Sequence, residues 1–361
     1  MKKYLLHVCG YAAPYPGNFI ASLTALAVDN KAMGFDTIFV FPYTAKNKEW
    51  CQNLEKEYIV YYLPLERARI KWITYKKLRE IYKKYNITIA HSHFELYDMP
   101  VSLMAPKSTK VFWHLHDDLG LIYKKSNAIY KLLWKIQYAW TSKNAVLLSV
   151  SEKGRRFAVR LGFNEENTYF LPNSIDIKRL EYKNYENEEC VQNYDFLIYG
   201  WDYLRKGVDI LEEAIPQIES LNFTCGIVAN EEVWKQIRSN NHLIYQPPVN
   251  NVTSLYRNIK CFLHISRQEG LSYALLEAIY SGVIIICSDI EQNLFAQKFP
   301  TVFLVPVEDS MALANKMKAI ITGALYITDD DVIKSKEMVR NEYSIESWVK
   351  KIQNFYFGSG L

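Results

Sequence analysis

The feature that most constrains the fold is an alternation of short apolar runs with segments of helix length, which occurs twice along the chain. The first series of runs is YLLHVC, TIFVFP, YIVYYLP, ITIAHS, KVFWHLH and AVLLSVS. The second series is DFLIYG, FTCGIVA, HLIYQPP, CFLHIS, VIIICSD and TVFLVP. Strands that alternate with helices form parallel sheets with helices on both faces. The pattern therefore predicts two α/β units, each of the Rossmann-like kind.

A polar, turn-rich stretch separates the two series. Residues 173–193 lack sustained periodicity, which is typical of a linker. We predict a first domain at 1–172, a linker at 173–193 and a second domain at 194–343. We expect the helix at 344–361 to pack back onto the first domain. A chain of 361 residues that is 49% hydrophobic is long enough for two such cores.

Composition excludes some classes of protein. No apolar run approaches the roughly 18 residues of a bilayer-spanning helix, so an integral membrane protein is not expected. The six cysteines have no CxxC spacing, and most lie in apolar runs where a reduced thiol packs as a small hydrophobe. These features predict a cytoplasmic protein.

The formal net charge of +4 conceals an uneven distribution. Residues 1–180 contain 27 Lys and Arg against 15 Asp and Glu, whereas residues 181–361 contain 16 against 24. A basic half suits an anionic partner, which leaves a membrane surface, a nucleic acid or a phosphorylated substrate. Nucleic acid is not expected, because no helix-turn-helix, RRM or OB-type pattern appears.

Two segments bear on the membrane interpretation. Residues 65–86 and 123–145 interleave Lys and Arg with Trp, Tyr, Ile and Leu at helical spacing. Basic amphipathic helices with aromatic residues suit a membrane interface. Ordinary covering helices with basic outer faces explain the same pattern equally well. The sequence therefore leaves open whether the protein contacts the inner face of the cell membrane.

Two glutamates stand eight residues apart in SRQEGLSYALLEAIYSGVIIICSD, residues 266–289. Glu277 falls in an apolar helix, and a buried carboxylate without partners costs several kcal/mol, so it should have a polar partner. Ser272 is a suitable N-cap for that helix, and the outward backbone amides would form an anion site. The amides suit a diphosphate, and Glu269 and Glu277 suit sugar hydroxyls. The pattern indicates a nucleotide sugar; a solvated Glu269 with Glu277 bonded to nearby backbone is the alternative.

Further site candidates follow other strands. Arg205 and Lys206 stand between a strand and a helix, where cations and amides together can hold a diphosphate. A solvated basic helix start is the alternative for this pair. Gly17 lies in the loop after the first strand and allows close backbone approach to a ligand.

Two strand ends of the first domain gather polar side chains. The first set is His114, His116, Asp117 and Asp118. The second set is His91, His93 and Glu95. The first set also suits a metal ion. The second set suits the acceptor side of a cleft or a plain strand-end role.

The stretch EGLSYALLEAIYSGVIIICSD resembles the Glu-x7-Glu signature of the family four glycosyltransferases. Four further segments resemble that family's segments in the same order: VSEKGRRFAVRLGF, YFLPNSID, RKGVDILEEA and FLVPVEDSMALANKM. The resemblance implies the GT-B fold, in which two Rossmann-like α/β/α domains face a central cleft. It also implies transfer of a sugar with retention of anomeric configuration.

The resemblance assigns roles to residues. It implies that Glu277 binds the donor's ribose hydroxyls and that Glu269 and His116 contact the transferred sugar. The implied catalytic residues are His116, Glu269 and Lys206. The implied donor-binding residues are Gly17, Arg205, Lys206, Glu269, Gly270, Leu271, Ser272, Tyr273 and Glu277. Trp201 stands where many family members have an arginine. No metal or other cofactor is expected, because GT-B enzymes generally bind their donors without a divalent cation.

The sequence thus predicts a retaining, hexosyl-type transferase with a nucleoside-diphosphate sugar, UDP-linked, as donor. The expected acceptor is a glycan or a lipid-linked molecule of cell-surface polysaccharide or glycolipid synthesis. A catalytically silent subunit that binds and stabilises an active partner is the alternative, to which Trp201 gives some weight. A glycoside hydrolase needs no cationic phosphate site, and a dehydrogenase would have GxGxxG after a strand, so both fit less well.

Overall fold

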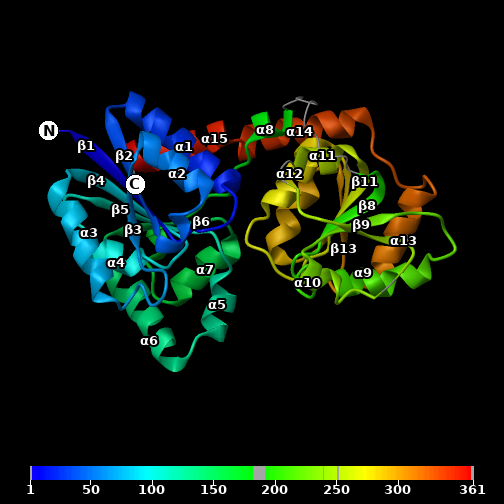
Figure 1. Cartoon of the computed structure of the whole chain (residues 1–361), viewed down its shortest axis with the longest axis horizontal. Coiled ribbons are helices and arrows are strands. Elements are labelled where there is room, and N and C mark those ends of the chain that lie inside the picture. The colour runs from blue at the N-terminus through cyan, green and yellow to red at the C-terminus, as the bar shows by residue number, and fades with distance from the viewer. Residues whose placement is uncertain (1, 182–191, 239, 250–251, 359–361) are drawn as a thin grey trace. The chain divides into compact units, whose positions relative to one another are not determined.

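The computed structural model describes residues 2–181, 192–238, 240–249 and 252–358. The chain forms two compact units (Figure 1). Unit 1 is Met1–Ser174 with Ile345–Leu361, and unit 2 is Ile175–Ser344. Each unit contains one parallel sheet with helices on its faces, so the predicted α/β fold class is confirmed.

The sheet of unit 1 has seven strands in the order β3-β2-β1-β4-β5-β6-β7. The strands are β1 (Lys3–Cys9), β2 (Phe35–Pro42), β3 (Ile59–Leu63), β4 (Ile87–His93), β5 (Lys110–Leu115), β6 (Ala145–Ser149) and β7 (Thr168–Phe170). All six pairings are parallel. Helices cover both faces, which is why these strands read as continuous apolar runs.

The helices of unit 1 form two layers. The elements are α1 (Gly17–Ala32), η1 (Tyr43–Ala45), α2 (Glu49–Glu57), α3 (Trp72–Lys84), α4 (Asp98–Met104), α5 (Leu119–Lys125), α6 (Ala128–Ile136), η2 (Gln137–Thr141), α7 (Glu152–Arg160), η3 (Glu165–Asn167) and α15 (Ile345–Phe357). Side chains of α1, α2 and α15 share one core with the sheet, and side chains of α3, α4, α6 and α7 share the other. The terminal helix α15 is therefore part of unit 1.

The sheet of unit 2 has six strands in the order β10-β9-β8-β11-β12-β13. The strands are β8 (Tyr194–Tyr199), β9 (Cys225–Val228), β10 (Leu243–Gln246), β11 (Ile259–His264), β12 (Ile284–Ser288) and β13 (Val302–Val305). The other elements are α8 (Ile177–Glu181), α9 (Val208–Ala214), η4 (Ile215–Gln217), α10 (Glu231–Trp234), α11 (Val252–Arg257), α12 (Tyr273–Ser281), η5 (Glu291–Lys298), α13 (Ser310–Ile321) and α14 (Asp329–Tyr343).

The segment predicted as a linker, 173–193, differs from the prediction in its first part. Ile175 already belongs to unit 2 and forms a parallel bridge with Ser344. Ile177 and Leu180 are buried one helical turn apart, and this spacing makes α8 an ordered helix rather than a linker. Residues 182–191, including Cys190, lie outside the described residues. The five described cysteines are buried and form no disulfide.

Each sheet has one point at which the strand order reverses. This point lies between β1 and β4 in unit 1 and between β8 and β11 in unit 2. Ligands of open α/β sheets bind beyond the carboxyl ends of the strands at such a point. The segments after these four strands are therefore where a site should form. Among the described residues, no helix combines the length and the apolar character needed to cross a bilayer.

Candidate active site

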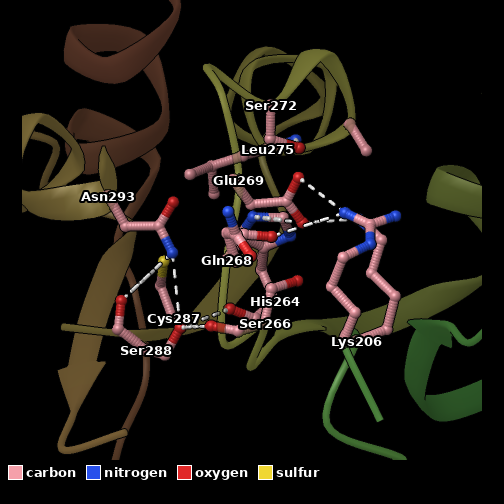
Figure 2. Close-up of polar contacts among 12 residues, drawn as sticks. Lys206, His264, Ser266, Gln268, Glu269, Ser272, Leu275, Cys287, Ser288 and Asn293 are labelled. Atoms are coloured by element: carbon pink, nitrogen blue, oxygen red, sulfur yellow. Dashed lines mark hydrogen bonds and ion pairs between the residues drawn. The ribbon is translucent and has the colours of Figure 1, made fainter. Parts of the chain in front are cut away.

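Two oppositely charged side chains meet at the strand-order reversal of unit 2. Lys206 follows β8, and Glu269 follows β11. Lys206 Nζ donates to Glu269 Oε1 across 2.5 Å, and both residues are buried (Figure 2). Burial lowers the pKa of Lys206, and Glu269 opposes that shift. Burial alone would raise the pKa of Glu269, but Lys206 and its other polar neighbours hold it below its ordinary value.

A second cation and a neutral imidazole complete the surroundings of Glu269. Arg205 Nη1 lies 3.6 Å from Glu269 Oε2, and His264 Nε2 lies 3.9 Å from Glu269 Oε1. Burial lowers the pKa of His264 to about 4, so the ring carries no charge near neutrality. Glu269 therefore has two cations within 4 Å, and Arg205 is in turn paired with Asp202 at 3.0 Å.

Trp201 covers both cations with its indole ring. The ring centroid lies 4.2 Å from Arg205 Cζ and 5.0 Å from Lys206 Nζ. Arg205 is also held by Asp202 Oδ2 at 3.0 Å. Cation–π contact stabilises a cation near the ring face. Trp201 thus stabilises both neighbouring cations.

Gly207 explains how the segment after β8 comes close to the segment after β11. Its φ of +74° lies in the left-handed region, and a Cβ there would meet the backbone oxygen of Ile265 at 2.4 Å. A side chain would therefore force the two segments apart. Their backbones also bond directly, since Arg267 N donates to Arg205 O across 2.9 Å. This close approach positions Lys206 against Glu269.

Helix α12 begins as the sequence predicts. The Ser272 side chain accepts a hydrogen bond from Leu275 N at 3.3 Å, which makes Ser272 the N-cap. Figure 2 shows the Glu269 carboxylate turned toward Lys206 beside this helix start. Gly270 and Leu271 connect Glu269 to the cap, and Tyr273 is the first helical residue. The positive end of a helix and two cations therefore lie together.

Glu277 is buried inside α12 and has a charged partner. Arg179 Nη2, from α8, donates to Glu277 Oε1. The prediction that Glu277 needs a polar partner is confirmed, and a guanidinium is one such partner. The role of Glu277 toward a ribose stays a prediction.

In unit 1, His116 belongs to a line of buried hydrogen-bonded side chains. His7 Nδ1 lies 3.1 Å from His93 Nε2, His93 Nδ1 lies 3.2 Å from His116 Nε2, and His116 Nδ1 lies 3.1 Å from Asn173 Oδ1. A neutral imidazole has one donor and one acceptor nitrogen, so these bonds require the same tautomer in all three rings. Burial lowers the pKa of His116 to about 4, although its bond to Asn173 partly opposes this shift. Both ring nitrogens of His116 are therefore in use, and a sugar contact would have to replace one of these bonds.

Two groups of three histidines have the spacing of metal ligands. Ring nitrogens of His93, His114 and His116 all lie within 4.8 Å of one another, as do those of His7, His91 and His93. The aspartates that the sequence places beside His114 and His116 do not join these groups. Asp118 instead accepts from Lys153 Nζ at 2.9 Å. Imidazoles alone suit transition metals, and the absence of a metal requirement stays a prediction.

The second set of candidates at a strand end lies in the interior. His91 and His93 have no exposed surface, and His91 Nδ1 bonds the Tyr356 hydroxyl at 2.5 Å. Glu95 forms an ion pair with Arg69. These contacts favour a structural role at the end of β4 over an acceptor surface.

The predicted site residues fall into two groups. Arg205, Lys206, Glu269 and the start of α12 come together in unit 2. Gly17 and His116 belong to unit 1, where Gly17 opens α1 with a φ of +54° that favours glycine. The sequence analysis missed Arg179, because it fell in the predicted linker and stands 98 residues before its partner Glu277.

Comparisons with known families agree with this arrangement. Residues 25–179 match the family described as Glycosyltransferase Family 4, and residues 194–323 match Glycosyl transferases group 1. The chain belongs to the family four glycosyltransferases. The first match ends inside the sequence-predicted linker, at residue 179, and the second begins directly after it, at residue 194. A comparison with curated proteins found no match.

Solved structures of similar fold cover nearly the whole glycosyltransferase. A glycosyltransferase from Rickettsia africae has a TM-score of 0.77 at 16% identity, with 98% of each chain covered. HepE from Anabaena, solved with UDP, has a TM-score of 0.77 at 14% identity, with 98% of this chain and 99% of HepE covered. The lipopolysaccharide outer core galactosyltransferase WaaB has a TM-score of 0.72 at 14% identity, with 99% and 100% covered. These similarities establish the GT-B fold.

Proposed function

We propose that this glycosyltransferase moves a hexose, with retention of configuration, from a UDP-linked sugar to a glycan or lipid-linked acceptor. The observation that carries the proposal is the Lys206–Glu269 pair beside the start of α12, at the strand-order reversal of unit 2. HepE, which has the same fold, was solved with UDP, with UDP and glucose, and with UDP-glucose. These complexes support a UDP-sugar as the donor here.

In the proposed complex, the diphosphate lies between cations and backbone amides. Lys206, Arg205 and the amides from Gly270 to Tyr273 hold its oxygens, because all of them are positive or donate hydrogen bonds. Glu269 accepts hydroxyls of the transferred sugar, and Glu277 accepts ribose hydroxyls while Arg179 offsets its charge. Two carboxylates can then lie near a diphosphate without net repulsion.

The proposed reaction takes place on one face of the sugar. The bond from the anomeric carbon to the β-phosphate oxygen breaks as the acceptor hydroxyl forms its bond on the same face. The hydroxyl proton moves to an oxygen of the departing diphosphate. Lys206 and Arg205 stabilise the negative charge that develops on this leaving group, a contribution of several kcal/mol in comparable sites.

No metal takes part in the proposed mechanism, because Lys206, Arg205 and the amides at the start of α12 supply the donors that hold the diphosphate oxygens. His116 would act after exchanging its bond with His93 for one to a sugar hydroxyl. The ring is neutral near pH 7, since burial holds its pKa at about 4. It therefore serves as a hydrogen-bond partner rather than as a cation.

The test combines binding with product analysis. Thermal denaturation with UDP-glucose, UDP-galactose and GDP-mannose should reveal the donor, because binding to the folded state raises the apparent stability. Proton NMR of the product should then show the anomeric configuration of the donor. An inverted product would overturn retention. Complete loss of activity in chelator would assign a metal, with His93, His114 and His116 as the first ligands to test.

The alternative of a silent subunit rests on Trp201 and makes a distinct prediction. Such a protein would bind a donor but would transfer its sugar neither to an acceptor nor to water. The stack of Trp201 on Arg205 and Lys206 favours the active enzyme, because it keeps two cations at the leaving-group side. We further propose an anionic membrane surface as the place of transfer, which agrees with the basic charge of residues 1–180.

A further inference from the structure

One segment of unit 1 contains basic residues and no acidic ones. Residues 119–151 contain five lysines, Lys124, Lys125, Lys131, Lys135 and Lys143, and no aspartate or glutamate. The segment comprises α5, α6 and η2 and continues into β6. In Figure 1, α6 is the lowest helix of unit 1. Four of the five lysines are exposed, and Lys131 is partly exposed.

The same segment presents large apolar side chains to solvent. Ile129 is 71% exposed, Leu132 59%, Ile136 40% and Trp140 74%. Spacings of three, four and four residues place them along one side of α6 and η2. The opposite side is anchored in the core by Trp134 and Tyr138, which are at most 1% exposed. The exposed apolar row is therefore separate from the side of the helix that packs in the core.

The other basic aromatic segment behaves differently. Helix α3 buries Leu78, Ile81 and Tyr82, and its lysines include Lys77, which donates to the Tyr43 hydroxyl at 2.6 Å. Trp72, at the start of α3, is 70% exposed but has no row of apolar neighbours along the helix. Helix α3 is thus an ordinary covering helix. The structure separates two segments that the sequence left equivalent.

We propose that the row Ile129, Leu132, Ile136 and Trp140, with its flanking lysines, is a docking surface for an anionic phospholipid bilayer. A helix that carries apolar side chains on one side and lysines beside them lies in the interface, with its apolar side among the acyl chains. The lysines then meet the phosphate groups, and each contributes a factor of about five to binding. This proposal names the residues that would make the membrane contact of the proposed function. Its biological role rests on that function.

A second copy of the chain is a less suitable occupant. A twofold contact brings the same surface of both copies together. Five lysines with no acidic residue in the segment would then face five identical lysines, which costs energy that an anionic bilayer does not impose. An anionic lipid surface therefore matches both the apolar row and its charge.

The test is co-sedimentation with two kinds of vesicle, phosphatidylglycerol mixed with phosphatidylcholine and phosphatidylcholine alone. The wild-type chain should bind the anionic vesicles, and this binding should decrease as salt rises. Ile129→Gln with Trp140→Gln should weaken binding at least tenfold, as should Lys135→Gln with Lys143→Gln. The matched control is Trp72→Gln, an equally exposed indole of the same unit, which should change binding less than twofold.

Three results would overturn the proposal. They are wild-type affinity of the Ile129/Trp140 variant, an equal loss in the Trp72 variant, and light scattering that shows a wild-type dimer dissociated by Trp140→Gln. Thermal stabilisation of each variant by UDP serves as a separate readout. If UDP fails to stabilise the wild type while vesicle binding behaves as expected, the proposed donor is wrong and the docking surface stands.

Discussion

At the scale of single residues, the charges around Glu269 come from side chains that follow different strands. Lys206 and Arg205 follow β8, and Glu269 and the start of α12 follow β11. Both Trp201 and Gly207 position the cations. The ring of Trp201 contacts them, and Gly207 lets the two segments approach because it has no side chain. Each contact concerns one or two atoms and can be changed separately.

Lys206 should be the main cation for the leaving group. Lys206→Ala should lower kcat by about 100-fold or more, because the diphosphate loses its nearest positive charge. The matched control is Lys260→Ala, which removes an exposed lysine of the same unit that pairs with Asp195, and it should leave kcat unchanged. Steady-state rates decide the matter. A decrease of less than threefold would mean that another group stabilises the leaving phosphate.

Glu277 and Arg179 should act as a pair. Glu277→Gln should weaken UDP binding by about tenfold or more, since a neutral amide replaces a charged acceptor at the ribose. Arg179→Met should destabilise unit 2 by about 1–3 kcal/mol, less than for a fully buried pair because Arg179 is partly exposed. Combining both changes should recover most of that stability. Calorimetry measures UDP binding, and denaturant unfolding measures the stability of the two single variants and the double variant. If the stability change of the double variant equals the sum of the changes in the single variants, the two side chains do not act as a pair.

At the scale of elements, helix caps offer a comparison within one chain. Ser272 caps α12 beside the candidate site, and Thr328 caps α14, where its side chain and that of Asp331 form a capping box. Both caps are single hydroxyls that satisfy backbone amides. They differ in that a diphosphate is proposed at the first cap and not at the second.

Ser272→Ala and Thr328→Ala should each cost about 1 kcal/mol of stability, because each leaves a helix amide without its cap. Only Ser272→Ala should also weaken UDP binding, since the amides at the start of α12 would lose their alignment. Ser272→Thr should restore both properties. Equal UDP affinity in the two alanine variants would show that the start of α12 does not bind the nucleotide.

Much of this element order could be predicted from the sequence. Twelve apolar runs correspond to strands, because a strand buried on both faces has to be apolar throughout. Strand β7 was missed, since its three residues give no pattern. The Ser272 cap and the cations Arg205 and Lys206 were found from local spacing. Arg179 and the line from His7 to Asn173 were not found, because their partners come from distant segments that only the fold brings together.

At the scale of the whole molecule, buried imidazoles should govern the response to acid. Six histidines are buried, and burial lowers the pKa of each; they are His7, His91, His93, His114, His116 and His264. In the unfolded chain a histidine titrates near 6.5, so below that pH the unfolded state binds more protons than the folded state. Asp98 acts in the opposite direction, because burial raises its pKa to about 7.

Stability should therefore be greatest near neutral pH and should fall as the pH decreases from about 6.5 toward 4. Each buried histidine contributes at most about 1.4 kcal/mol per pH unit to this loss, and six such groups outweigh one aspartate. Denaturant unfolding at a series of pH values measures the slope. His116→Gln should reduce the slope, because it removes one of the six groups. Unchanged stability between about pH 7 and pH 5 would show that these rings titrate normally.

The place of α15 in unit 1 has a consequence for synthesis. Trp348, Ile352 and Tyr356 belong to the core that this helix shares with α1 and α2, yet they are translated after all of unit 2. On the ribosome, unit 2 can finish folding first, whereas unit 1 must wait with one face of its sheet covered by α1 and α2 but not by α15. A chain stopped after residue 344 should thus keep a protease-resistant unit 2 and a digestible unit 1. Unit 1, which begins to be translated first, is therefore the last unit to complete its fold.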